Sequence, residues 1–423
     1  MKFNKWTVGL AAVGVVSLAS AARADEKMNS LQTALSNTTI SGYVSASFNY
    51  AITPGGGKNQ FSPAELIPFQ GQRNSFSEGA QAPTKQDGFN LDVVKLTIAK
   101  PEDESPWASG YQVDLIFGPD AVGYNTSANA IENNGNVGQS SDFAIKQAYV
   151  TLRTPVGNGI DWKIGVFDTI IGYEVFDAGS NPNYTRSWGY AIEPTEHTGI
   201  LASYKLNDMF SFSAGLANTL SAGINARDGE SGFANNSNNK PDGAGSFWHK
   251  TVMGSATFTA PSSWGWAAGS SIYAGAVYGF TSSTHGYAND YQLNWYGGAT
   301  MNTPWKQLTA GIAFDYAEHY LAAPVNVWSL GVYATYKATD KLSFSGRAEY
   351  VEGDAVNSSS NFNPDLMELT ATVEYDLWAN VVSRVELRYD HVLDDLNSVG
   401  DALGSDIAFR TSVGLYANII YKF

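Results

Sequence analysis

Cysteine is absent from the 423 residues of the chain. Its absence excludes a disulfide framework and thiolate chemistry, and it suits an exported protein that avoids mispaired disulfides in an oxidising compartment. Basic residues are scarce as well, because 25 Lys and Arg stand against 40 Asp and Glu, a formal net charge of −15. An acidic surplus of this size argues against nucleic acid as a partner.

Long apolar runs are almost absent too. One occurs at residues 6–22, behind two lysines, and it ends in the sequence Ala22-Arg23-Ala24 before a charged stretch. This is the pattern of a secretory signal peptide, so we expect residues 1–24 to be removed after Ala24; an anchoring helix is the alternative. The two lysines and Arg23 would leave with it, which takes the formal net charge from −15 to −18.

Behind this run no stretch of about 18 apolar residues occurs, so no transmembrane helix is expected. Residues 25–38 are polar, and we interpret them as a short periplasmic segment. What is abundant is the combination of 11 Trp, 23 Tyr, 21 Phe and 42 Gly with only 15% charged residues. That mixture suits a β-barrel that uses both a polar and an apolar face.

From residue 39 onward the chain alternates with period two, as strands do. Ile40 and Phe48 share one face, for example, while Ser45 lies on the other. A slip in the alternation at Val93-Val94 predicts a β-bulge. The expected strands cover residues 40–50, 89–98, 111–117, 147–153, 160–167, 198–205, 210–216, 251–259, 266–280, 291–302, 308–316, 328–336, 342–351, 367–377, 381–390 and 411–423.

The connections between these strands alternate between short and long. The longer ones span residues 53–86, 118–142, 168–195, 217–250, 281–290, 317–327, 352–366 and 391–410. Sixteen strands with both termini on the side of the short turns match the outer-membrane pattern of short periplasmic turns and longer extracellular loops. A soluble β-sandwich has no reason to sort its loops by length, and a propeller would need four-strand repeats, which we do not find. We therefore predict an all-β, transmembrane antiparallel up-and-down barrel over residues 39–423.

The two faces of the strands differ in charge. The apolar rows hold no charged residue except Lys146 at a rim, and a charge at the membrane midplane costs roughly 2–4 kcal/mol. A barrel of this strand count leaves an aqueous channel, into which the opposite rows would point. Those rows carry Asp92, Lys95, Asp114, Arg153, Asp161, Lys163, Arg347, Glu349, Glu368, Glu374, Arg384, Glu386, Arg388 and Asp390.

Two further signals point to the outer membrane. Tryptophans recur in or beside four of the short turns, at Trp107, Trp264, Trp305 and Trp378, where an interfacial girdle is expected. The last strand alternates apolar residues and ends in Phe423, which resembles the signal read by the barrel assembly machinery. We expect outer-membrane lipid and lipopolysaccharide to be the surrounding partners.

The long connection at residues 168–195 is both apolar and charged. It is a loop by its Gly, Asn and Pro content, but its aromatic and branched side chains require burial. Charged residues are interleaved with them at Glu174, Asp177, Arg186 and Glu193. This loop is the third long one, and we predict that it folds into the lumen and narrows it.

A constriction would oppose charges across the pore. We expect the acids Glu174 and Asp177 of this loop, with Arg186 beside them, to face a set of basic side chains on the wall. The resulting transverse field would favour dipolar solutes, and the acid surplus predicts modest cation preference. The alternative is that the charges form mutually satisfied pairs that only solvate the wall. The wall bases in question are Lys95, Arg153, Lys163, Arg347, Arg384 and Arg388.

Several short stretches are similar to the OmpL-like β-barrel porin family. They are Phe143-Ala-Ile-Lys-Gln-Ala-Tyr-Val150, Gly165-Val-Phe-Asp168, Gly172-Tyr-Glu174, Asn183-Tyr-Thr-Arg-Ser187 and His197-Thr-Gly199. The resemblance covers most of the mature chain and is densest between residues 89 and 205. It implies an outer-membrane barrel of porin type and no particular substrate. The strand count and third-loop position also resemble general diffusion porins, which are commonly trimers, although the loop sequence differs from theirs.

Other chemistry finds little support. His197 and His319 each follow a glutamate and could be offered as bases of a barrel enzyme, but no nucleophile, base and orienting group can be assembled, and we interpret both as rim histidines. No histidine pair has metal-ligand spacing, and we expect no metal or cofactor. Loops at residues 226–232 and 234–242 are rich in Asn, Asp and Gly, yet their spacing fails the EF-hand pattern for Ca²⁺.

The sequence as a whole predicts a porin in the bacterial outer membrane, a homotrimer by resemblance, through which small hydrophilic solutes and ions diffuse passively. Gly42, Ala46, Ala214, Gly254 and Ala256 on the outward rows would permit close contact between barrels. The alternatives are a solute-specific channel, a barrel enzyme, or a structural or adhesin barrel that does not conduct.

Overall fold

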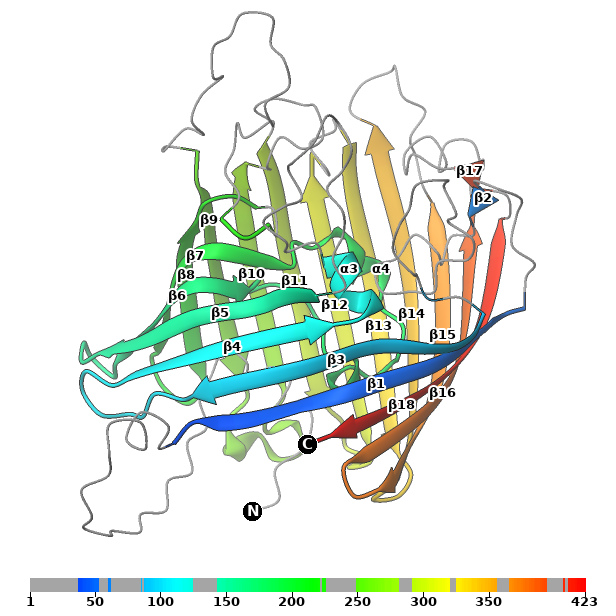
Figure 1. The fold of residues 1–423 in the computed structure, drawn as a ribbon, viewed down its shortest axis with the longest axis horizontal. Helices are drawn as coiled ribbons and strands as arrows, with labels where there is room; N and C mark the ends of the chain where they lie inside the picture. Colours follow the sequence, from blue (N-terminus) through cyan, green and yellow to red (C-terminus); the bar gives the residue numbers. More distant parts are fainter. Residues whose placement is uncertain are drawn as a thin grey trace, which may run out of the picture.

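In the computed structural model the chain forms a closed antiparallel barrel (Figure 1). The structure describes residues 37–52, 60–61, 85, 87–124, 143–220, 223–225, 249–280, 291–319, 325–355, 365–393, 406–407 and 410–423. The predicted sixteen-stranded barrel is confirmed. Its strands are β1 (Thr39–Ala51), β3 (Gly88–Lys100), β4 (Ser109–Phe117), β5 (Phe143–Thr154), β6 (Ile160–Asp168), β7 (Glu196–Lys205), β8 (Phe210–Ala217), β9 (Thr251–Thr259), β10 (Ser271–Phe280), β11 (Tyr291–Asn302), β12 (Leu308–Glu318), β13 (Val325–Lys337), β14 (Leu342–Ala355), β15 (Leu366–Trp378), β16 (Val381–Val392) and β18 (Thr411–Lys422).

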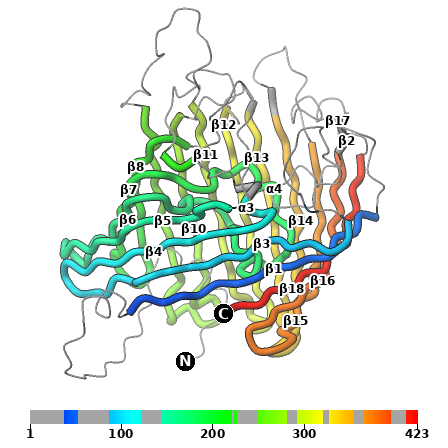
Figure 2. The backbone as a smooth tube through the Cα atoms, in the orientation of Figure 1, coloured from blue at the N-terminus to red at the C-terminus, as the bar shows by residue number. Residues whose placement is uncertain are grey.

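The first and last strands close the barrel. β1 pairs with β18 in antiparallel register from Tyr43 opposite Lys422 to Ala51 opposite Gly414. Figure 2 shows the two ends of the barrel chain, blue and red, lying side by side. Consecutive strands pair with each other all the way round, which is the up-and-down order that the alternating loop lengths predict. Every strand edge is thereby paired, as a sheet in a membrane requires.

Local departures from the predicted strands have identifiable causes. β10 begins at Ser271 rather than at residue 266, because the 3₁₀ turn η4 (Ser262–Ala267) precedes it and Gly265 has a φ of 61°. β5 begins earlier than expected, at Phe143. A two-stranded parallel sheet between β2 (Gln60–Phe61) and β17 (Asp406–Ile407) joins the first and last long connections and was not predicted. Strands of two residues are too short for a period-two alternation to be recognised in the sequence.

β-Bulges in β3 and β5 change the direction in which side chains point. In β3 the register shifts so that Val93 pairs with Ser45 and Leu91 with Ala46, which places a bulge at Asp92, one residue from the predicted slip. In β5 the register skips Lys146 in the same way. The prediction that Lys146 lies in an outward row at the rim is therefore wrong. The bulged Lys146 is buried and its Nζ lies 2.5 Å from Oδ2 of Asp168.

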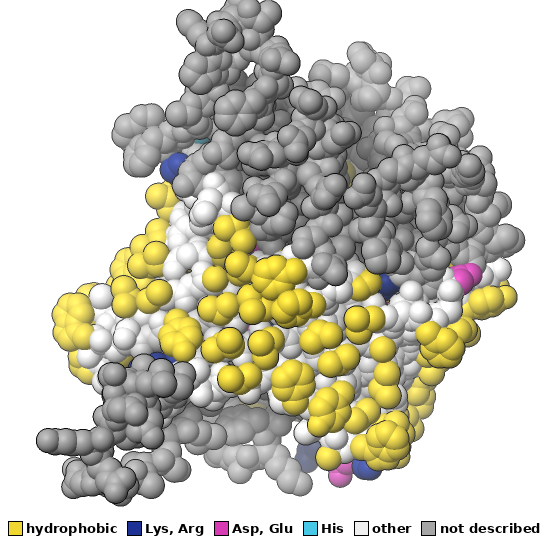
Figure 3. Space-filling model, in the orientation of Figure 1, with side chains coloured by type: hydrophobic (Ala, Val, Ile, Leu, Met, Phe, Trp, Pro, Cys, Tyr) yellow, Lys and Arg dark blue, Asp and Glu magenta, His cyan; other side chains and the backbone are white. Residues whose placement is uncertain are grey.

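The barrel is apolar outside and polar inside. Large hydrophobic side chains such as Val150, Ile272 and Val385 are exposed, whereas the charged side chains on the opposite rows of β14–β16 are mostly buried. Figure 3 shows hydrophobic side chains across the visible strands, with the few charged ones at the edges of this band. Trp107, Trp264, Trp305 and Trp378 are all exposed beside short turns, as a membrane-interface girdle requires.

Charge is distributed unevenly around the wall. The four neighbouring strands β8–β11 contain no Lys, Arg, Asp or Glu on either face. The neighbouring strands β14–β16, in contrast, carry Arg347, Glu349, Glu368, Glu374, Arg384, Glu386, Arg388 and Asp390 on their inward rows. We call the first set the uncharged wall and the second set the charged wall.

Several expectations lie outside the described residues. These are the signal peptide at residues 1–24, nearly all of the periplasmic segment at 25–38, and the Asn-, Asp- and Gly-rich loops at 226–232 and 234–242. Among the described helices, which include α3 (Pro119–Tyr124), none has the length and apolar character needed to cross a membrane.

Candidate functional site

Residues 169–195 connect β6 to β7 and form the most extensively buried connection that the structure describes. This segment contains the turn η3 (Ala178–Ser180) and the short helix α4 (Trp188–Ile192). Ser187 caps α4, because its hydroxyl accepts a hydrogen bond of 3.0 Å from the amide of Tyr190. At Gly172 the chain turns with a φ of +114°, a conformation that favours glycine.

Apolar side chains of segment 169–195 pack in two places. Ile171 and the half-buried Tyr173 pack with inward residues of β9–β13, where the Tyr173 ring stacks on Tyr333 with centroids 4.2 Å apart. Further along, Phe176 and Tyr184 are buried with inward residues of β1, β3, β4, β5 and β18. The aromatic content that made this loop unusual in the sequence is thus accounted for by burial.

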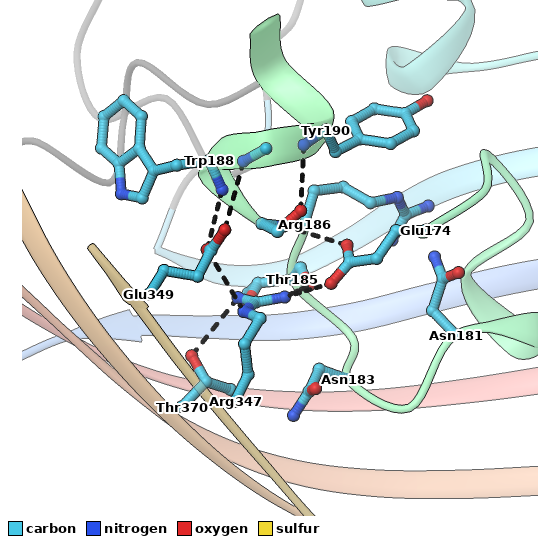
Figure 4. Close-up of polar contacts among 12 residues, drawn as sticks. Glu174, Asn181, Asn183, Thr185, Arg186, Trp188, Tyr190, Arg347, Glu349 and Thr370 are labelled. Carbon is cyan, nitrogen blue, oxygen red and sulfur yellow. Dashed lines mark hydrogen bonds and ion pairs between the residues drawn. The ribbon is translucent and has the colours of Figure 1, made fainter. Parts of the chain in front are cut away.

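The charged wall contacts the same segment through Arg347. Its guanidinium lies 2.7 Å from Oε1 of Glu174 and 3.1 Å from Oε2 of Glu368, and all three side chains are fully buried. Arg347 also donates to the carbonyl of Thr185 at 2.8 Å. Glu174 belongs to the segment, whereas Arg347 and Glu368 are wall residues, so this contact joins the two (Figure 4).

Two wall carboxylates accept hydrogen bonds from consecutive backbone amides of the segment. Glu386 accepts from Tyr184 at 2.6 Å and from Thr185 at 2.8 Å. Glu349 accepts from Trp188 at 2.8 Å and from Gly189 at 3.1 Å, as Figure 4 shows. A side chain at position 189 would collide with the carboxylate of Asp315, so glycine lets the backbone approach the wall.

Arginines of the charged wall donate hydrogen bonds to backbone carbonyls of the segment. Arg384 donates to Ala178 at 2.6 Å and to Asn181 at 3.1 Å, and Arg388 donates to the carbonyl of Arg186 at 2.5 Å. An irregular backbone at this depth leaves amides and carbonyls without ladder partners, and such groups must be satisfied when buried. The charged wall supplies those partners.

The first strands hold a second group of charges. Lys95 on β3 lies 2.8 Å from Oδ2 of Asp177, and the hydroxyl of Tyr43 donates to Asp177 at 3.0 Å. Burial alone would raise the pKa of Asp177, but the charges of Lys95 and Lys146 outweigh it and hold that pKa at about 2. Asp177 is therefore ionised throughout the physiological pH range.

The predicted site residues separate into three sets. Arg347, Arg384 and Arg388 contact segment 169–195 directly, together with its own Glu174. Lys95 on β3, which β1 and β18 separate from β16, pairs with Asp177. The remaining three residues, Arg186, Arg153 and Lys163, make other contacts.

Arg186 donates to the carbonyls of Tyr184 and Phe176, so its guanidinium braces the segment internally. Arg153 pairs at 2.5 Å with Asp161 within the wall, and the Lys163 ammonium lies 4.8 Å from the ring centroid of Tyr149. Neither Arg153 nor Lys163 belongs to the network around Arg347.

Two kinds of residue were missed when candidate site residues were chosen from the sequence. Glu349 and Glu386 were recognised as inward but not as acceptors for backbone amides, a role that depends on an irregular path with no sequence signature. Half-buried tyrosines on the inner side, Tyr149, Tyr173 and Tyr273, were not singled out. The inward positions of Tyr149 and Tyr273 follow from period two, so that signal was available.

His197 and His319 occupy strand ends. His197 is completely buried and its Nε2 lies 3.3 Å from Oγ1 of Thr169. His319 ends its described stretch with a φ of 55°, and its ring packs at a tilt of 46° on Tyr291, with centroids 4.7 Å apart. Neither contact assembles a nucleophile, a base and an orienting group.

A closed, even-stranded antiparallel barrel with an apolar exterior and a charged interior defines an outer-membrane β-barrel of porin type. The family model described as "Putative beta-barrel porin-2, OmpL-like" matches residues 37–423. The chain therefore belongs to this family, and the resemblance drawn from its sequence is confirmed.

Solved structures share the fold at low sequence identity. A Salmonella typhi OmpF complex with daunomycin is 14% identical, with a TM-score of 0.57 over 91% of this chain and 97% of that one. The outer membrane channel DcaP of Acinetobacter baumannii is 13% identical, with a TM-score of 0.53 over 91% and 97%. An anion-selective porin from Comamonas acidovorans is 12% identical, with a TM-score of 0.53 over 91% and 99%. No curated protein matches the chain.

Proposed function

We propose that segment 169–195 crosses the lumen at mid-height and narrows an aqueous channel for passive diffusion of small hydrophilic solutes and ions. The observation that carries this proposal is the ion pair between Glu174 and Arg347. The segment leaves from β6 and returns to β7, which lie on the opposite side of the closed strand order from β15 and its neighbours. A connection that bonds inward side chains on that opposite wall must pass through the interior.

The predicted constriction residues divide into two roles in this proposal. Glu174, Arg186, Arg347, Arg384 and Arg388 are buried and paired, so they hold the segment in place rather than line the opening. The field in the opening comes instead from groups that keep contact with water.

Among those water-contacting groups, Asp168, Asp177 and Glu374 have side chains that are 35%, 32% and 26% exposed. The basic groups that keep contact with water are Arg153 and Lys163, which are both half-buried. Acid therefore predominates at the water-contacting positions, and the proposal includes a modest cation preference.

Planar-bilayer recording of the mature barrel tests the proposal. We expect a steady conductance and a reversal potential in a salt gradient that indicates modest cation preference. A variant in which a short glycine-serine linker replaces residues 170–194 should conduct more, because the crossing segment is removed. Clear anion selectivity would contradict the charge argument, and an unchanged conductance in the linker variant would contradict the crossing segment.

A folded barrel that does not conduct would instead favour the structural or adhesin alternative. The control for the linker variant is Tyr278→Ala, an exposed outward position on β10 whose replacement leaves the interior intact.

Processing and assembly remain part of the proposal. We infer export with cleavage after Ala24, recognition of the last strand through Phe423 by the assembly machinery, and assembly as a trimer in lipid and lipopolysaccharide. The solved structure of OmpT from Vibrio cholerae in its trimer form shares 14% identity and a TM-score of 0.51 with this chain. N-terminal sequencing of the exported protein and light scattering in detergent test the first and last of these points.

A further inference from the structure

The uncharged wall has a composition of its own. Along β8–β11 the inward rows consist of Ser, Thr, Gly, Ala, Tyr, Asn, Gln and two aliphatic residues, and none is ionisable except tyrosine. Solutes with a charge are recognised in channels by opposite charges on the wall. A wall without charge over four neighbouring strands offers hydrogen bonds and ring surfaces instead.

Three half-buried tyrosines pack against one apolar cluster beside this wall. They are Tyr149 on β5, Tyr173 on segment 169–195 and Tyr273 on β10. The cluster beneath them includes Leu201 and Met253. Tyrosine rings that are fixed from below and only partly covered present flat apolar surface to whatever occupies the lumen.

Tyr273 lies on β10, within the uncharged wall. It follows Ile272, which is 57% exposed on the outer face, and it lies on the same inward row as Val277. Among the described residues no other aromatic ring stacks on Tyr273, whereas Tyr173 is already stacked on Tyr333.

Neutral polar groups lie beside these rings, and the ammonium of Lys163 lies 4.8 Å from the ring centroid of Tyr149. Tyr149 donates to Oε1 of Gln112 at 3.0 Å. Ser255 and Thr257 lie half-buried on the inward row of β9, where Thr257 is opposite Tyr273 and Ser255 is opposite Gly275. Hydroxyls of this kind both donate and accept hydrogen bonds.

We propose that this tyrosine face is a subsite for neutral polyhydroxylated solutes, that is, for saccharides. A sugar ring has an apolar face that suits an aromatic ring and a rim of hydroxyls that suits serine, threonine and amide partners. This inference rests on the proposed channel and names a solute class for it. Segment 169–195 covers the charged wall and also packs on part of the uncharged wall through Ile171. Beside that contact Tyr273, Ser255 and Thr257 stay half-buried, and they are the groups left to contact the solute.

Single-channel recording with maltohexaose tests the subsite. We expect saturable block by maltohexaose, while a polyethylene glycol of similar mass and succinate give no saturable block. Tyr273→Ala should raise the half-blocking concentration about fivefold by removing one ring surface. Tyr273→Phe keeps the ring and should stay within about twofold of the wild type.

The matched control is Tyr278→Ala, the same substitution on the same strand at an outward position, which should leave the block unchanged. Heat-modifiable migration in detergent gels establishes that each variant is a folded barrel, and titration calorimetry in detergent gives a second measure of binding.

The outcomes separate the two proposals. A conducting wild type that maltohexaose does not block, or equal block in wild type and Tyr273→Ala, would overturn the saccharide subsite and leave the channel standing. Stronger saturable block by succinate would overturn it in favour of a charged solute. A folded wild type without conductance would contradict the channel itself, and the subsite with it.

Discussion

The charged wall and the uncharged wall are built from the same kind of strand, yet they make opposite contacts. On β14–β16 the inward side chains bond to the backbone of segment 169–195. On β9 and β10 the inward residues Met253 and Val277 meet that segment through apolar side chains, in a cluster with Ile171. Charged side chains therefore hold irregular backbone on the first wall, whereas the uncharged wall meets the segment through apolar side chains and through a neutral hydrogen bond, from Asn294 to the carbonyl of Ile192 at 2.8 Å.

The difference follows from what each wall must satisfy. Irregular backbone carries amides and carbonyls that cannot remain unpaired when buried, and a charged acceptor or donor serves them more strongly than a neutral one. Buried charges in turn need partners, and here the wall acids and bases also pair with one another, as Arg388 does with Asp390 at 2.8 Å. The uncharged wall carries no charges that need partners, and its Asn294 serves the carbonyl of Ile192 with a neutral amide.

The largest effect is expected when the centre of the charged wall is removed. Arg347→Met would leave Glu174, Glu349 and Glu368 buried without their cation, and breaking a buried pair in this way costs about 3–5 kcal/mol. We expect a lower unfolding temperature and noisy, increased conductance, because the segment is released. Ser255→Ala on the uncharged wall should shift the free energy of unfolding by no more than about 0.5 kcal/mol.

Thermal unfolding of Arg347→Met and of Ser255→Ala, each compared with the wild type, checks this expectation. Equal loss of stability in both would remove the distinction between the walls.

A smaller effect is expected at a single amide acceptor. Glu349→Gln keeps one acceptor oxygen but loses the charge that serves Trp188 and Gly189, and hydrogen bonds to charged groups contribute about 1.5–3 kcal/mol. The control is Glu374→Gln on the same wall, whose side chain is 26% exposed beside Arg384; its loss should cost about 0–1 kcal/mol. Denaturant titration of both variants gives the two values, and a larger loss at Glu374 would contradict the role of Glu349.

The ion pair between Lys95 and Asp177 lies outside both walls, and we expect its contribution to stability to be smaller still. The pKa of Asp177 is held at about 2, below the ordinary carboxyl value, so its stabilisation is present above that ordinary value and is lost as the pH falls toward 2. Because the side chain is 32% exposed, solvent screening limits the contribution to about 1 kcal/mol. We expect Asp177→Asn to be less stable than the wild type at neutral pH and the difference to shrink below pH ~4. A difference independent of pH would refute the ionic origin.

The smallest effect on the structure is expected when a basic residue is introduced on the uncharged wall. This change should alter only the ion selectivity. Thr257→Lys on β9 should move the reversal potential toward anions while the fold is kept, because the added charge contacts water in the lumen. Thr257→Val has a similar size without the charge and should leave the reversal potential unchanged. If both variants behave alike, the uncharged wall does not face the ion path.

The sequence predicts the barrel well because its signal is periodic. Alternation and loop length are enough for sixteen strands, and the bulge lies one residue from the slip at Val93. Lys146 is the informative failure, since a strict period of two assigns it outward and cannot register the bulge that turns it toward Asp168. The shift of the β10 start has a similar origin, a positive φ at Gly265.

The candidate site was predicted only in part. The inward positions of Arg347, Arg384 and Arg388 follow from alternation, because their strands are regular. The roles of Glu349 and Glu386 do not follow, because they depend on the path of a segment with no period, fixed by contacts between distant parts of the chain. Tertiary contacts of this kind leave no local pattern to read.

The hydrogen bond from Tyr184 to Glu386 also constrains the order of assembly. The two residues are 202 positions apart, so the amide of Tyr184 meets its acceptor only after the chain has reached β16. The same holds for Trp188 and Glu349 across 161 positions. Contacts of such sequence separation form late, after the long intervening chain is ordered. The segment between β6 and β7 is thus synthesised early and docked late, and its docking reports that the C-terminal strands have taken their places.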